Sequence, residues 1–131
     1  MAHPQVSCVL ASKVPKKLAK FYSIAMGVES RQGLNNDYCS ICHPDGMKIE
    51  FYRPSRDQKW PSRGSVLGIC LSSEASFDPI SEIRSWTAKL VSIGAEIIEK
   101  PRLESFGAES WISDPEGNHF LIYVPVKPIK I

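Results

Sequence analysis

Two short segments carry mainly polar and aromatic side chains at alternate positions, which a β-strand would place on one face. The six residues are Lys48, Glu50 and Tyr52 in the first segment and His119, Leu121 and Tyr123 in the second. A partly buried carboxylate has a raised pKa and can act as a general base, and a histidine can carry a second proton. Glu50 and His119 are therefore the candidate catalytic residues. Two alternatives stay open: Lys48 and Glu50 simply pair with each other, and His119 lies exposed beside a turn.

Two of the four cysteines fall in a pattern typical of covalent haem attachment, Cys39-Ser40-Ile41-Cys42-His43. That attachment requires export, and the amino-terminal residues do not form a basic and apolar signal region, so we expect a cytoplasmic protein with reduced thiols and no cofactor. Positions three apart in a strand point to opposite faces, which also argues against a two-cysteine metal clasp. Cys70 alternates with Gly68 and is a candidate ligand contact, but the sequence identifies no base for it.

The three tryptophans divide between the interior and a possible ligand site. Trp86 lies on an apolar helical stripe and is expected in the core. Trp111 could stack on a ligand or fill the core, and the sequence favours neither. Trp60 could cover a ligand as a lid or tether a linker to the body. Phe106-Gly107 is expected in a flexible loop that could close over a site.

Composition limits the classes of partner. The 131 residues are 43% hydrophobic, which suits one compact domain or two half-size modules. The net charge is only +2, and the lysines between residues 13 and 20 are explained by a solvated helix face. Because the sequence has no dense basic run with interleaved aromatics and no apolar run of membrane-spanning length, we expect neither a nucleic-acid nor a membrane partner.

An internal repeat indicates how these residues are positioned. Pro44-Asp45-Gly46 precedes one of the two segments, and Pro115-Glu116-Gly117 precedes the other, 71 residues later, with a tyrosine and a proline following at the same offsets. Each copy is typical of a tight turn that leads into a short strand. The chain therefore contains one structural unit twice.

The elements expected around the repeat are the same in both halves: a strand, a helix and three strands. The first helix spans residues 14–26, with Pro15 in its first turn and Gly27 at its end, and the second begins at Asp78 and ends before Gly94. The expected strands are 6–11, 29–33, 38–43 and 47–52 in the first half and 66–72, 96–100, 109–113 and 119–124 in the second.

This order resembles the vicinal oxygen chelate superfamily, which includes glyoxalase I, extradiol dioxygenases, fosfomycin-resistance enzymes and bleomycin-binding proteins. Leu18-Ala19-Lys20-Phe21-Tyr22 with Gly27 resembles the family's first helix, and Ser113-Asp114-Pro115-Glu116-Gly117-Asn118 resembles its penultimate turn. The resemblance covers nearly the whole chain. It implies an α+β fold of two βαβββ modules that form a curved mixed sheet with an inner cleft for a small ligand, and a homodimer.

The resemblance also implies four metal-ligand positions, one on the first and one on the last strand of each module. By position these fall on Ser7, Glu50, Gly68 and Leu121, so only Glu50 has the ligand type found in the family. A divalent ion in a water-accessible cleft needs several charged or imidazole donors. We therefore expect the chain to bind no metal.

Together these observations predict a single glyoxalase-like domain over residues 1–131, with modules 6–52 and 65–125 and a linker at 53–64. The predicted function is of the glyoxalase or bleomycin-resistance type: binding of a small, partly apolar molecule in the cleft between the modules. The expected ligand contacts are Lys48, Tyr52, Cys70, Trp111, Leu121 and Tyr123. Two alternatives remain: a lyase, isomerase or dioxygenase-type enzyme that uses Glu50 as base or residual ligand, and a degenerate scaffold for protein interaction.

Overall fold

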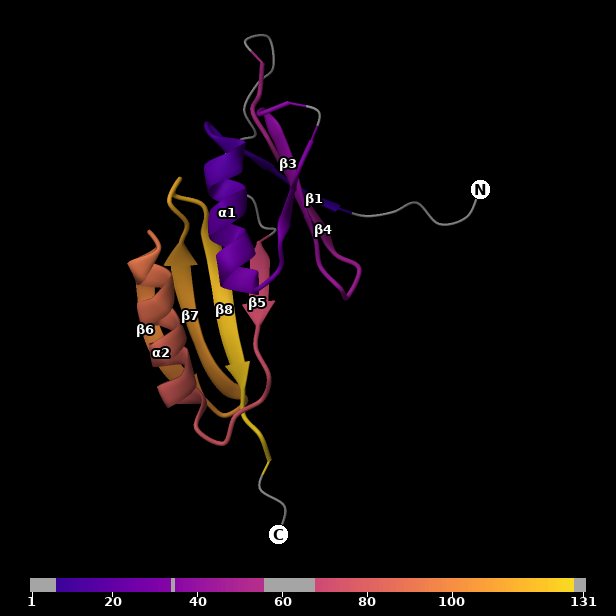
Figure 1. Cartoon of the computed structure of the whole chain (residues 1–131). Coiled ribbons are helices and arrows are strands. Elements are labelled where there is room, and N and C mark those ends of the chain that lie inside the picture. Colours follow the sequence, from indigo (N-terminus) through magenta and orange to yellow (C-terminus); the bar gives the residue numbers. More distant parts are fainter. Residues whose placement is uncertain (1–6, 34, 56–67, 129–131) are drawn as a thin grey trace. The chain divides into compact units, whose positions relative to one another are not determined.

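The computed structural model describes residues 7–33, 35–55 and 68–128 (Figure 1). The chain divides into two compact units, Met1–Gly64 (unit 1) and Ser65–Ile131 (unit 2). Each unit contains one helix and one four-stranded mixed sheet. The fold is therefore α+β with two βαβββ modules, as the sequence predicts.

Unit 1 has its strands in the order β1-β4-β3-β2, with β1 parallel to β4 and the other pairs antiparallel. Its elements are β1 (Ser7–Ala11), α1 (Pro15–Met26), β2 (Ser30–Gln32), β3 (Tyr38–Cys42) and β4 (Lys48–Tyr52). Pro15 opens α1, where a missing N–H costs little, and Gly27 ends it with a left-handed φ of 68°. Tyr22 of α1 packs on Phe51 of β4 with ring centroids 5.7 Å apart, so the core lies between α1 and one face of the sheet.

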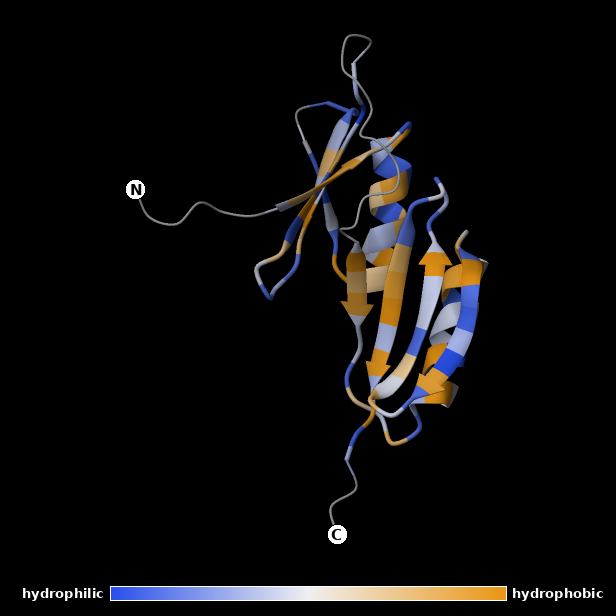
Figure 2. Ribbon diagram, turned by 180° about the vertical axis from the view of Figure 1, so that it is seen from behind, coloured by the Kyte–Doolittle hydropathy of each residue, from blue (hydrophilic) through white to orange (hydrophobic). Residues whose placement is uncertain are grey.

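Unit 2 repeats this topology in the order β5-β8-β7-β6, again with one parallel pair, β5 and β8. Its elements are β5 (Ile69–Ser72), α2 (Pro79–Ser92), β6 (Glu96–Glu104), β7 (Gly107–Ser113) and β8 (His119–Pro125). The carboxylate of Asp78 accepts a hydrogen bond from the backbone N–H of Ser81 at 3.3 Å and caps α2, as predicted. Figure 2 views this sheet from the side opposite α2 and shows that most residues along the ribbon of β8 are hydrophobic.

The apolar stripe expected on α2 consists of Ile83, Trp86, Leu90 and Ile93, and the structure buries only part of it. Ile83 and Leu90 are buried together with Thr87, whereas Trp86 is half-buried, and Ile93 is half-buried just after the helix ends. Thr87 tolerates burial because its hydroxyl donates to the backbone carbonyl of Ile83. Trp86 therefore lies at the margin of the helix–sheet contact.

The hairpin of β6 and β7 is longer than the sequence predicted. The strand expected at 96–100 continues past Pro101 to Glu104, with two register shifts against β7 on either side of Glu99. Phe106-Gly107 is consequently not in a flexible loop, because Phe106 completes a tight turn and Gly107 begins β7. A Cβ on Gly107 would lie 2.3 Å from the carbonyl oxygen of Val124, so only glycine fits there.

The two repeated turns have the same hydrogen-bond pattern. In unit 1 the side chain of His43 accepts from the backbone N–H of Asp45 at 3.1 Å, and in unit 2 the carboxylate of Asp114 accepts from that of Glu116 at 2.9 Å. The backbone N–H of His43 donates to Met47 at 2.8 Å, and that of Asp114 donates to Asn118 at 2.8 Å. His43 and Asp114 thus cap equivalent turns and fix where β4 and β8 begin.

Several predicted features lie outside the described residues: Trp60, most of the expected linker, and the first residues of the strands expected at 6–11 and 66–72. None of the described helices combines the length and the apolar character needed to cross a bilayer.

Candidate functional site

The alternation along β4 separates two kinds of side chain. Ile49 and Phe51 are 2% and 0% exposed and belong to the core beside α1. Lys48, Glu50 and Tyr52 are half-buried on the opposite face, which we call the helix-free face of unit 1. The three residues therefore share one face, as their alternation predicts.

Glu50 is the centre of a hydrogen-bonded cluster on this face. The hydroxyl of Ser7, on β1, donates to Glu50 Oε2 at 2.9 Å. The phenol of Tyr38, on β3, donates to Glu50 Oε1, and the ammonium of Lys48 lies 3.4 Å from the same oxygen. Three strands thus hold one carboxylate from three directions.

This environment lowers the pKa of Glu50 below its ordinary value. The hydrogen bond from Tyr38 is the largest cause, and Ser7 and Lys48 add to it, outweighing the opposing effect of burial. The pKa of Tyr38 is raised, chiefly because its hydroxyl donates to Glu50, and the pKa of Lys48 is raised for the same reason. At neutral pH the cluster therefore consists of an ionised carboxylate, a neutral phenol and an ammonium.

The direction of this shift corrects the sequence-based expectation for Glu50. Burial was expected to raise the pKa and make Glu50 a base, but the charged form accepts three donors, and these dominate over desolvation. Lys48 and Glu50 do pair, as one alternative proposed, but this ion pair is only one of the three contacts of the Glu50 carboxylate described here.

Tyr38 and Ser40 are members of this face that the sequence analysis missed. The antiparallel register of β3 and β4 places Tyr38 opposite Tyr52 and Ser40 opposite Glu50. Ser40 is 8% exposed. A signal was available, since Tyr38 and Tyr52 are equally far from the turn residue Asp45, which predicts that they pair.

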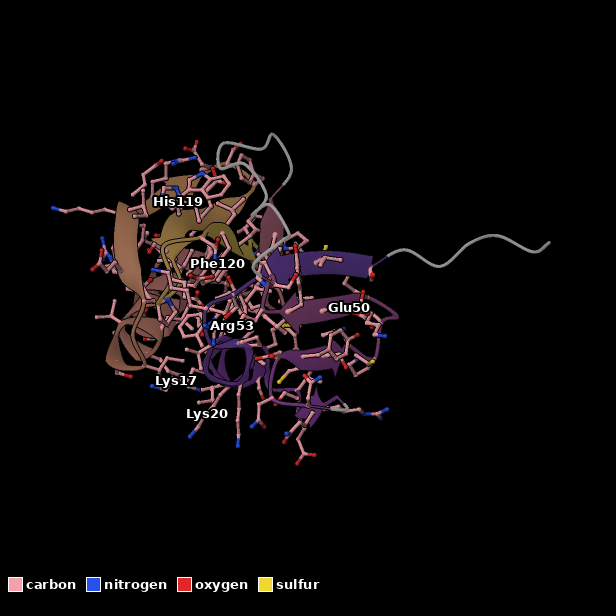
Figure 3. The ribbon with its side chains drawn as sticks, turned by 90° about the horizontal axis from the view of Figure 1, so that it is seen from above. Lys17, Lys20, Glu50, Arg53, His119 and Phe120 are labelled. Atoms are coloured by element: carbon pink, nitrogen blue, oxygen red, sulfur yellow. The ribbon has the colours of Figure 1, made fainter. Side chains whose placement is uncertain are left out.

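Unit 2 has a corresponding helix-free face on β8, formed by His119, Leu121 and Tyr123. Leu121 and Tyr123 are half-buried, whereas the intervening residues belong to the core beside α2. His119 is exposed at the first position of the strand, next to the turn, as the second alternative for this residue described. Figure 3 shows the labelled His119 in unit 2 and Glu50 among the strands of unit 1, with Lys17 and Lys20 extending outward from α1.

Trp111 and Cys70 flank Leu121 on this face. Trp111 of β7 is paired with Leu121, and Cys70 of β5 is paired with Leu121 from the other side. Trp111 is half-buried and Cys70 is exposed. A Cβ on Gly68 would lie 3.8 Å from Cη2 of Trp111, so the indole reaches toward the start of β5.

Charged side chains border Trp111 on the β6 side. Arg102 forms ion pairs with Glu99, Glu104 and Glu109, and its Nε lies 3.0 Å from Glu104. The register places Glu99 opposite Trp111 and Arg102 opposite Glu109. Three carboxylates therefore surround one guanidinium at this edge.

The predicted site residues thus form two groups, one on each unit. Unit 1 brings Ser7, Lys48, Glu50 and Tyr52 together, and unit 2 brings together His119, Leu121, Tyr123, Cys70, Trp111 and Gly68. All four thiols are free, with Cys39 buried and Cys42 exposed, as expected for residues on opposite faces of a strand. Within the described ranges no three His, Cys, Asp or Glu side chains are grouped so that they could hold a metal ion.

Comparison with known proteins assigns the architecture. A family model described as a glyoxalase-like domain matches residues 7–123. No curated protein matches the chain. Among solved structures, hypothetical protein SA1046 from S. aureus is 15% identical, with a TM-score of 0.68 over 95% of this chain and 94% of that one.

Two further solved structures have related descriptions. A glyoxalase/bleomycin resistance protein/dioxygenase family enzyme from Burkholderia phytofirmans PsJN is 15% identical, with a TM-score of 0.64 over 93% of this chain and 97% of that one. Lactoylglutathione lyase from Agrobacterium tumefaciens is 16% identical, with a TM-score of 0.59 over 95% of this chain and 94% of that one. At these identities the likeness establishes the fold alone.

Proposed function

Because the chain belongs to the glyoxalase-like domain family, we propose that it binds a small, partly apolar organic molecule at the helix-free faces of its two sheets. Unit 1 offers a fixed ionic cluster, and unit 2 offers an aromatic and aliphatic surface. Ligand sites commonly combine a largely apolar lining with a few fixed polar groups that orient the ligand. Each face has features of such a site.

The observation that carries the proposal is the immobilised carboxylate of Glu50. A carboxylate has about four acceptor positions, and donors in the described part of the chain use three of them. The remaining position, on Oε2, can accept an N–H or O–H from a ligand. Since the carboxylate is already oriented and ionised, little ordering cost remains for the ligand to offset.

The residues present do not fit the metal that the superfamily resemblance implies. Of the four ligand positions, Gly68 has no side chain and Leu121 is a hydrocarbon. The hydroxyl of Ser7 donates a hydrogen bond to Glu50, so the carboxylate of Glu50 is the one charged metal ligand among the four positions. Three protein donors thus stabilise the charge of Glu50 that a metal ion would otherwise neutralise.

The lowered pKa of Glu50 argues against the lyase or isomerase alternative. A general base works best when its pKa lies near the operating pH, and a carboxylate whose pKa is lowered holds a proton poorly. Removing a proton from carbon would therefore gain little from this group. Ligand binding, by contrast, requires only the ionised form of Glu50, which its lowered pKa favours.

The test is a ligand search followed by one isosteric substitution. A library of small aromatic and aliphatic amines, amides and acids would be screened by NMR on the ¹⁵N-labelled protein, with affinities measured by titration. Glu50→Gln should weaken binding of hydrogen-bond-donating hits by about tenfold, because a charged acceptor is replaced by a neutral one. Glu29→Gln, the same change at an exposed residue, should leave affinity unchanged. Equal affinity for wild type and Glu50→Gln would refute the anchoring role.

A further inference from the structure

We propose that Trp111 is a stacking platform for a planar, positively charged ring, and that the small Gly68 leaves room for the indole. The inference rests on the proposed function, because it specifies the class of ligand on the helix-free face of unit 2. It concerns Trp111 of β7 and Gly68, which directly precedes β5 in the same unit.

The indole of Trp111 extends along the sheet rather than away from it. Its strand, β7, is separated from β5 by β8, and neighbouring strands lie about 4.8 Å apart. Cη2, on the outer edge of the six-membered ring, nevertheless comes within 3.8 Å of the position that a Cβ on Gly68 would take. The indole therefore crosses β8 near Leu121, its partner in the register. A ring lying across a strand can present a flat surface to a ligand ring.

Gly68 matters for this placement because it is small, and its backbone does not demand glycine. Its φ is not among the positive φ values of the described glycines. An alanine there would make an ordinary contact with Trp111, whereas the additional atoms of a branched side chain would reach into the volume of the indole. The position corresponds to a metal-ligand position in the resembling superfamily, and here the neighbouring space is used by an aromatic ring.

The charge around the platform favours a cation. Glu99 lies directly opposite Trp111 in the register, and Glu99, Glu104 and Glu109 surround the single positive charge of Arg102. The face of an indole also attracts a cation through its quadrupole. Both contributions disfavour a planar anion. The flat indole therefore selects a planar ligand, and the surrounding negative charge selects a cationic one.

The test uses two flat three-ring probes of opposite charge, the cation proflavine and the anion anthracene-2-carboxylate. Their affinities for the full-length protein would be measured by fluorescence titration at low salt. We expect proflavine to bind at least about tenfold more tightly than the anion. Gly68→Ile should weaken proflavine binding by about tenfold or more, because it displaces the indole, and Gly68→Ala should change it by less than about twofold.

A third variant separates displacement of the ring from misfolding. Trp111→Leu removes the ring without adding volume and should reproduce the loss in Gly68→Ile, with far-UV circular dichroism unchanged in both. Wild-type affinity in Gly68→Ile or Trp111→Leu, preference for the anion, or no proflavine binding to the wild type would each overturn the platform. None of these results bears on Glu50, whose role is decided by the Glu50→Gln comparison on hits from the library.

Discussion

The paired turns predict an unequal response to the same substitution at equivalent positions. Asp114 is 2% exposed, and its carboxylate accepts three hydrogen bonds: from the backbone N–H of Glu116 at 2.9 Å, and from the backbone N–H and the side-chain amide of Asn118 at 3.0 and 2.8 Å. His43, its counterpart in unit 1, is half-buried and accepts one backbone hydrogen bond at 3.1 Å. Replacing Asp114 by alanine removes at least these three hydrogen bonds, and replacing His43 removes this one and the 3.6 Å contact between its Nδ1 and the carboxylate of Asp45.

The expected magnitudes follow from these counts. A net contribution of about 1 kcal/mol for each hydrogen bond gives about 3 kcal/mol for Asp114→Ala, since the released donors of half-buried residues can turn to water. The same reasoning gives about 0.5–1 kcal/mol for His43→Ala, whose acceptor is neutral. Asp114→Asn keeps one acceptor oxygen for the two backbone donors and should fall between them, at about 1–1.5 kcal/mol.

Urea unfolding monitored by circular dichroism measures these differences. With a slope of about 1.5 kcal/mol/M, the midpoint should fall by about 2 M for Asp114→Ala and by about 0.5 M for His43→Ala. A double variant tests independence, because the turns lie in separate units and the two losses should add. An equal loss for His43→Ala and Asp114→Ala, or an Asp114→Asn variant as unstable as Asp114→Ala, would show that hydrogen bonding to this carboxylate does not hold the turn.

Four further predictions follow from the site and the sequence. After dialysis, elemental analysis should find well under one equivalent of transition metal, and a tightly held ion whose binding is lost in Glu50→Gln would contradict the proposed function. Thiol titration should count four thiols in the denatured protein, and in the native protein it should modify exposed Cys42 and Cys70 well before Cys39, whose burial raises its pKa. The pKa of Glu50 in the folded protein lies below its ordinary value of 4.5, so its contribution to the free energy of unfolding is present above pH 4.5 and is lost as the pH falls through the folded pKa. The difference in unfolding free energy between wild type and Glu50→Gln should therefore shrink below about pH 4.5. A constant difference down to pH 2 would contradict this reasoning. Trypsin should cleave first within the expected linker, residues 53–64, and prior cleavage within α1 would argue against the division into modules.

Sequence patterns predicted the elements well where a local cause sets them. Pro15 and Gly27 delimit α1, and Asp78 with Pro79 begins α2, because capping and the constraints of proline and glycine act within a few residues. The repeat correctly located both turns. The extension of β6 past Pro101 was missed because an edge strand can accommodate a proline that a central strand cannot.

The electrostatic state of the site was not predictable from β4 alone. It depends on Ser7, 43 residues away along the chain, and on Tyr38, across a hairpin. Alternation correctly placed Glu50 on the helix-free face, but the sign of its pKa shift depends on how many donors reach the carboxylate. Trp111 was likewise undecided, because the space beside Gly68 exists only once β5 pairs with β8.

The irregular pairing of β6 bears on whether this edge strand can pair with a strand of another chain. Ile97, Ile98 and Leu103 are 45%, 47% and 60% exposed on a nine-residue edge strand, a composition that would invite another chain to add a strand. Pro101 has no N–H to donate to such a strand, and the two register shifts bend the backbone away from a regular ladder. β6 therefore provides the length needed to position Glu99 and Arg102 without becoming a template for intermolecular β-sheet growth.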